Sequence, residues 1–66
     1  MAVVKVVELM ADSTESWEAA TQAAVTEASK TIDNIQSVYV KNFQAVVEDK
    51  NVTKYRVNVK VTFVVK

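Results

Sequence analysis

The stretch that decides the fold is Tyr55-Arg56-Val57-Asn58-Val59-Lys60-Val61-Thr62-Phe63-Val64-Val65. Its apolar and polar side chains alternate with a period of two, which places them on opposite sides of an extended chain and predicts a β-strand. The odd-numbered side is apolar throughout, and the opposite side carries Arg56, Asn58, Lys60 and Thr62. The apolar side must be covered, and we expect the rest of this short chain to supply the cover.

The chain has 66 residues, the length of a single domain spanning 1–66. A domain of this size buries only about 60% of the surface that its unfolded chain exposes, so its own core is marginal. The sequence contains no cysteine and no histidine, and it therefore offers no disulfide and no thiolate or imidazole metal ligand. Packing between copies of the chain is the expected source of additional stability.

The composition also narrows the classes of function. Eight basic residues balance eight acidic ones, so no net field would attract nucleic acid or an anionic membrane. No apolar run is long enough to span a bilayer, and the first residues lack the pattern of a signal peptide, which predicts a cytoplasmic protein. An enzyme is not expected, because without histidine, cysteine or glycine no general base, thiol nucleophile or phosphate loop stands out.

Residues Val3 to Met10 are rich in β-branched side chains and predict a first strand. Both sides of this strand are apolar, and a single helix can cover only one of them. The other side is therefore expected to contact a second subunit. The two sides consist of Val3, Val7 and Leu9, and of Val4, Val6 and Met10.

A helix is predicted from Thr14 to about Thr31. Ser13 is a suitable N-cap, because a serine hydroxyl can accept a hydrogen bond from a free backbone N–H of the first turn. Glu15 and Glu18 follow in the first turns, where the helix dipole favours negative charge.

The covering side of this helix is a narrow seam of mostly small residues, which lets a helix lie close to a sheet. Trp17 belongs to this seam and is assigned to the core, although a lone tryptophan can also serve as a stacking platform for a flat ligand. Lys30 and Asp33 mark the end of the helix, and Asn34 is expected in the left-handed conformation. The seam consists of Trp17, Ala20, Ala24, Ala28 and Ile32.

The second strand is predicted from Ile35 to Val47, with Glu48 to Asn51 as a hairpin loop before the third strand. Plain alternation along it places Ser37, Tyr39 and Phe43 on one side. The whole chain then reads as an α+β fold of β-α-β-β order, a three-stranded antiparallel sheet with one helix across one face. The hairpin is longer than the helix, so part of it must extend beyond the helix and leave apolar surface for a neighbour.

Three stretches of the sequence, STESWEAA at 13–20, KTIDNI at 30–35 and YRVNVKVTF at 55–63, resemble the dodecins in order and spacing over nearly the whole chain. This resemblance implies a sheet that partly wraps its helix and twelve copies forming a hollow cage. It also implies storage or sequestration of a small molecule at subunit interfaces. In this family the small molecule is usually a flavin such as FMN, riboflavin or FAD. The polar side of the last strand would then face neighbouring subunits or the ligand.

Two residues depart from the flavin-binding pattern of this family. Ser37 stands where the resemblance expects a tryptophan that stacks on the flavin ring, and Arg56 stands where it expects a glutamine that hydrogen-bonds the ring edge. Losing an aromatic stacking partner forfeits roughly 1–3 kcal/mol by analogy with nucleobases. Arg56 can itself stack on a flat ring, pair with a phosphate, or form a cross-strand ion pair with a carboxylate. The alternative is therefore a structural or cation-stabilised cage without flavin.

Other residues enter as weaker candidates. Tyr39, Phe43 and Tyr55 could supply an aromatic surface at an interface, although aromatic residues in strands more often belong to a core. The acidic groupings show no regular calcium-loop spacing, so no dedicated metal site is predicted within one chain. These groupings are Asp12, Glu15, Glu18 and the Glu48–Asp49 pair.

Overall fold

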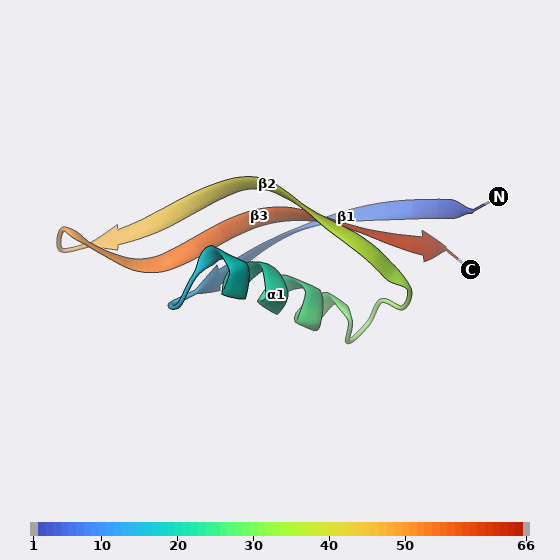
Figure 1. The fold of residues 1–66 in the computed structure, drawn as a ribbon, viewed down its shortest axis with the longest axis horizontal. Helices are drawn as coiled ribbons and strands as arrows, with labels where there is room; N and C mark the ends of the chain where they lie inside the picture. The colour runs from blue at the N-terminus through green and yellow to red at the C-terminus, as the bar shows by residue number, and fades with distance from the viewer. Residues whose placement is uncertain (1, 66) are drawn as a thin grey trace.

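A computed structural model describes residues 2–65 as one antiparallel sheet with a helix across one face (Figure 1). The elements are β1 (Val3–Ser13), α1 (Trp17–Ala28), β2 (Ile35–Glu48) and β3 (Asn51–Val65). The strands lie in the order β1-β3-β2, and both neighbours of β3 run antiparallel to it. The predicted β-α-β-β order and three-stranded antiparallel sheet are confirmed.

The core lies between the middle of β3 and the small residues of α1. Val57, Val59 and Val61 are completely buried, which confirms the predicted apolar side of β3. Ala20 and Ala24 pack against them from the helix, and Ala28 is also buried. Because alanine has a short side chain, the helix axis can approach the sheet closely, as the seam predicted.

The start of the helix differs from the prediction. Strand β1 continues to Ser13, which pairs with Tyr55, and the Ser13 hydroxyl accepts a hydrogen bond from the Glu15 N–H at 3.0 Å. The N-cap is Ser16, whose hydroxyl accepts from the Ala19 N–H at 3.0 Å. The prediction of Ser13 as the cap and Glu15 in the first turn was therefore wrong, whereas Glu18 does lie in the first turn.

The helix also ends before the predicted position. Its last residue is Ala28 rather than a residue near Thr31, and Ser29 is the C-cap in the right-handed conformation. Ile32 lies beyond the helix, where its N–H donates to the Ala28 carbonyl at 2.9 Å. Asn34 has a φ of 62°, so its left-handed conformation is confirmed, in the loop before β2.

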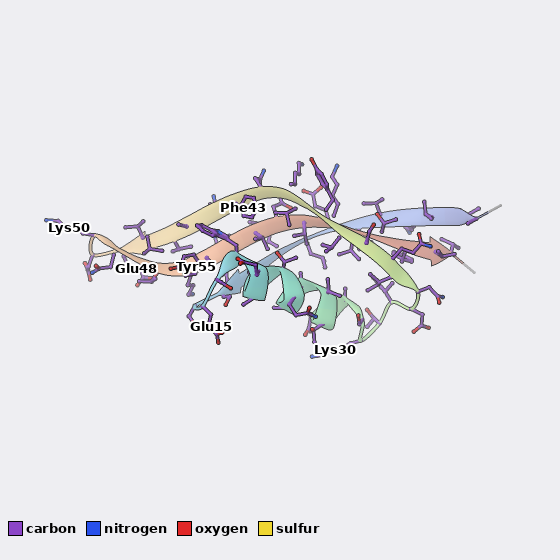
Figure 2. The ribbon with its side chains drawn as sticks, viewed as in Figure 1. Glu15, Lys30, Phe43, Glu48, Lys50 and Tyr55 are labelled. Atoms are coloured by element: carbon purple, nitrogen blue, oxygen red, sulfur yellow. The ribbon has the colours of Figure 1, made fainter. Side chains whose placement is uncertain are left out.

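The hairpin between β2 and β3 extends well beyond the helix (Figure 1). Its turn contains only Asp49 and Lys50, both with positive φ, at 49° and 69°. Two such residues form the tight turn that matches the twist of paired strands, here without a glycine. Glu48 and Asn51 pair across the turn, so the loop is shorter than the predicted 48–51. Figure 2 shows Glu48 and Lys50 at the tip, away from the helix.

Strand β2 does not keep one alternation along its length. Its pairing with β3 shifts between Val40 and Asn42, where a bulge changes which residues face the helix. Tyr39 lies opposite Lys60 on the outer side of the sheet, whereas Phe43 lies opposite the buried Val57 on the helix side. The prediction that Tyr39 and Phe43 share a side was wrong for this reason.

The two apolar sides of β1 are confirmed by its register with β3. Val7 and Leu9 pair with Val61 and Val59 on the helix side and are half-buried against the core. The opposite side is the outer face of the sheet, which the helix does not cover. There Val4, Val6 and Met10 are exposed by 51%, 50% and 62%. Much apolar surface therefore stays open in a single protomer.

Candidate ligand-binding site

The residues that the sequence predicts for ligand binding, Ser37 and Arg56, lie on the outer face of the sheet. Arg56 stands in a row between Asp12 of β1 and Gln44 of β2. Ser37 is exposed and lies opposite Thr62 near the other end of β3. Both residues come from extended strands, so their positions are fixed by the pairing register and not by a loop.

One protomer does not bring these two residues together. Ser37 lies opposite Thr62, which is six residues from Arg56 along β3. At about 3.3 Å per residue the two positions are roughly 20 Å apart. A flavin ring does not span that distance, so a site containing both residues requires more than one copy of the chain.

Arg56 forms a two-pronged ion pair with Asp12. Its Nε donates to Asp12 Oδ1 at 2.7 Å, and its Nη2 donates to Oδ2 at 3.2 Å. About a third of each side chain is exposed. These hydrogen bonds hold the pKa of the Asp12 carboxyl below its usual value and raise the pKa of Arg56. Asp12 is therefore an Arg56 partner in this structure.

A second ion pair crosses the same face of the sheet. The Lys41 ammonium lies 3.5 Å from the Glu8 carboxylate, and both side chains are nearly half exposed. In the register Glu8 is opposite Lys60, and Lys60 is opposite Tyr39. Tyr39 is exposed by 66%, so an open aromatic ring lies beside these charges.

Asn58 occupies the middle of this face, between Met10 and Asn42 in the register. Within residues 2–65 its Oδ1 atom is buried and has no hydrogen-bond partner. Buried polar atoms in native proteins nearly always have a partner. Asn58 therefore leaves an unsatisfied acceptor in the middle of the sheet of a single protomer.

The other two candidate aromatic residues pack around Trp17 on the helix side. Trp17 meets Tyr55 and Phe43 edge to face, with ring centroids 5.0 Å and 5.9 Å apart. Its Nε1 also donates to the Gln44 carbonyl at 3.0 Å. Figure 2 shows Phe43 and Tyr55 near the start of the helix. Trp17 is packed against the core as predicted, and its contacts with Phe43, Gln44 and Tyr55 connect the start of the helix to β2 and β3.

An apolar groove opens between α1 and β2 beside this aromatic cluster. Its volume is about 470 Å³, within the range of small-molecule pockets. Phe43, in its wall, is exposed by 63%. Neither Ser37 nor Arg56 contributes to it. Trp17 and Phe43, both considered from the sequence as aromatic candidates, do contribute, but their meeting in one groove was not predicted. The residues that line it are Trp17, Glu18, Thr21, Gln22, Val25, Val38, Val40 and Phe43.

The described part of the chain shows no grouping of three or more acidic, histidine or cysteine side chains that could hold a metal ion. Of the acidic residues considered from the sequence, Asp12 is engaged by Arg56. Glu48 and Asp49 lie at the hairpin tip, and Glu15 precedes the helix. Within residues 2–65, no helix is both long and apolar enough to cross a membrane.

The partners of the two cross-strand ion pairs could be predicted from the sequence only in part. A carboxylate partner for Arg56 was foreseen, but Asp12 is 44 positions away and only the register of β1 on β3 identifies it. The Lys41–Glu8 pair, 33 positions apart, was not foreseen. The available signal was that Asp12 and Arg56, like Glu8 and Lys60, fall in line when the first and last strands are aligned antiparallel.

Comparisons with known proteins agree with this architecture. The family model described as Dodecin matches residues 3–66. A dodecin mutant from T. thermophilus is 35% identical with a TM-score of 0.94, over 100% of this chain and 98% of that chain. A dodecin from Streptomyces coelicolor is 26% identical, with a TM-score of 0.94 over 98% and 93% of the two chains. Among curated protein sequences, none matches.

A calcium dodecin from Mycobacterium tuberculosis is also similar, at 30% identity and a TM-score of 0.86, over 97% of this chain and 91% of that chain. That protein is described as calcium-chelating, with a novel calcium-binding site. The family match covers nearly the full length, and the solved structures reproduce the same sheet and helix. The chain therefore belongs to the dodecin family.

Proposed function

We propose that this chain assembles with copies of itself into a hollow dodecin-type cage of twelve subunits. The cage binds a small planar molecule, in the first instance a flavin, at its subunit interfaces. It does so without catalysing a reaction. The observation that carries this proposal is the open surface of the protomer, because its small buried core contrasts with the large apolar side chains exposed on both faces.

The exposed surfaces are of the kind that subunits cover. The outer face carries the exposed side chains of Val4, Val6 and Met10. The groove between α1 and β2 supplies further apolar surface on the helix side. The extended hairpin adds the exposed side chains of Val47 and Val52. A single small core of this size gives little stability, and burial between subunits adds to it.

The separation of Ser37 and Arg56 supports a ligand site between subunits. Since the two residues lie roughly 20 Å apart along β3 in one protomer, a shared site must take them from different copies. Flavin-binding relatives would stack the ring on an aromatic residue at the Ser37 position. A serine provides no such surface, so we expect the affinity of this chain for flavin to be weak.

Two measurements test the proposal. Native mass spectrometry of the untreated protein should give a mass near twelve chains, together with any bound molecule. A monomer mass at micromolar concentration would refute the cage. Titration of riboflavin and FMN should show quenching of flavin fluorescence, and a colourless protein that quenches neither at micromolar concentration would refute flavin as the ligand.

The variant Ser37→Trp with Arg56→Gln restores both residues that the resemblance expects. The new indole offers a stacking surface worth roughly 1–3 kcal/mol, which corresponds to a gain of about five- to 150-fold in flavin affinity. Unchanged titration curves would show that these two positions do not explain weak binding.

The second candidate function is a cation-stabilised cage without an organic ligand. The calcium-chelating relative from M. tuberculosis favours it. Within residues 2–65 no single protomer gathers enough acidic groups, so a cation would have to lie where carboxylates of several subunits meet. Removal of calcium with a chelator should then lower the mass or the melting temperature of the assembly, whereas a flavin-binding cage would be unaffected.

A further inference from the structure

The Asp12–Arg56 pair has a geometry that stability alone does not explain. It joins neighbouring residues of the edge strand β1 and the central strand β3 through two hydrogen bonds of 2.7 Å and 3.2 Å, with about a third of each side chain exposed. Exposed ion pairs of this kind contribute little to folding, because water screens both charges. Its stronger effect is on the charge that the outer face presents beside Gln44.

The Asp12 carboxylate neutralises the charge of Arg56 but leaves part of its hydrogen-bonding capacity unused. A guanidinium has five N–H donors, and Asp12 uses one on Nε and one on Nη2. Donors on the remaining edge and free lone pairs on the carboxylate therefore stay available to a neutral ligand. A phosphate would have to displace Asp12 or lie next to its negative charge. Lys54, the next residue on the same side of β3, is the other charged group that acts on Asp12.

We propose that Asp12 determines the charge class of the ligand bound at Arg56, favouring an uncharged flavin over a phosphorylated one. This inference rests on the proposed function, because it assumes that a flavin binds at the outer face near Arg56. Riboflavin and FMN share the ring and differ in a phosphate of roughly −1.5 to −2 charge, so the ratio of their affinities isolates the effect of charge.

The experiment uses the Ser37→Trp background, in which flavin binding is strengthened. The dissociation constants of riboflavin and FMN are measured by fluorescence quenching for this protein and for its Asp12→Asn and Arg56→Gln derivatives. Glu8→Gln is the matched control, because it removes a carboxylate of the same face that pairs with Lys41 instead. Native mass spectra confirm that each variant keeps the same assembly.

Asp12→Asn should raise the affinity for FMN relative to riboflavin by about three- to fivefold, the upper part of the range that one exposed charge supplies. Arg56→Gln leaves Asp12 unpaired and should change the ratio in the opposite direction. Glu8→Gln should leave the ratio within about twofold, and added salt should reduce the Asp12→Asn effect.

Opposite shifts by the Asp12 and Arg56 variants support the inference, since a purely structural role would change both ligands together. An unchanged ratio, or shifts in the same direction, would overturn it while leaving flavin binding itself intact. Absence of binding of either flavin in the Ser37→Trp background would instead refute the proposed function, and with it the basis of the inference.

Discussion

Truncation of Val59 to alanine tests the core directly, because this side chain lies at the centre of β3. It is completely buried, pairs with Leu9 on one side and Val40 on the other, and packs beneath Ala20 and Ala24. Removing two methyl groups loses about 0.8 kcal/mol each in transfer free energy. The cavity left behind adds to this, because a helix seam of alanines cannot fill it, so we expect a total of about 2–3 kcal/mol.

The assay is urea unfolding followed by the fluorescence of Trp17, the single tryptophan, which packs against this core. Val6→Ala is the matched control, because it makes the same chemical change at a side chain exposed by 50% on the outer face. Val59→Ala should destabilise the protein at every protein concentration. Val6→Ala should act mainly through assembly, so its effect should depend on protein concentration.

Equal losses from the two variants, both independent of protein concentration, would refute this account of the core. They would mean that the outer face of β1 is covered within the protomer as fully as the helix side. A loss below about 0.5 kcal/mol for Val59→Ala would refute the tight helix–sheet packing instead, because buried truncations of this size regularly exceed it.

Three further predictions follow from the same structure. Val59→Lys should abolish folding or assembly because it buries an unpaired charge, and a soluble particle of native size by light scattering would contradict the face assignment. Trp17→Phe should lower the free energy of unfolding by about 1–2 kcal/mol, measured by circular dichroism, because it removes the Nε1 hydrogen bond to the Gln44 carbonyl. Tyr55→Phe keeps the edge-to-face ring contact and should leave the free energy of unfolding nearly unchanged. Because the pKa of Asp12 is lowered in the folded state, its pair with Arg56 stabilises the fold at pH values above the ordinary pKa of 3.8, and this stabilisation disappears as the pH falls through the lower pKa of the folded state. Unfolding free energies measured between neutral and acid pH should therefore show this loss in the unsubstituted protein and not in Asp12→Asn. Identical pH profiles for the two proteins would contradict the prediction.

The regular parts of the fold could be predicted because each of their sequence patterns is compatible with only one type of secondary structure. Period-two alternation over residues 55–65 identifies the buried side of β3, and the alanines of the helix fall at the three- and four-residue spacing of one helix face. The start of the helix could not be decided locally, because Ser13 and Ser16 are equally good caps. The pairing of Ser13 with Tyr55 selects Ser16.

The bulge in β2 was missed because plain alternation was assumed along the whole strand. A bulge is often marked by glycine, but this sequence has none, and its local sign is weaker: two polar residues, Lys41 and Asn42, stand between Val40 and Phe43 where strict alternation allows one. Only the pairing with β3 shows that Phe43 joins Trp17 on the helix side while Tyr39 stays on the outer face. Sequence periodicity is reliable within an unbroken ladder, and it fails at the point where the ladder shifts.

The candidate site shows a further boundary of sequence reasoning. The resemblance to flavin-binding dodecins predicts that Ser37 and Arg56 share one ligand site, whereas the register separates them by roughly 20 Å within a protomer. If the site takes one residue from each of two subunits, ligand binding and assembly are linked by mass action. The free energy by which bound flavin stabilises the assembly must then equal the free energy by which assembly strengthens flavin binding. A ligand that binds without raising the melting temperature of the assembly therefore cannot lie between the subunits.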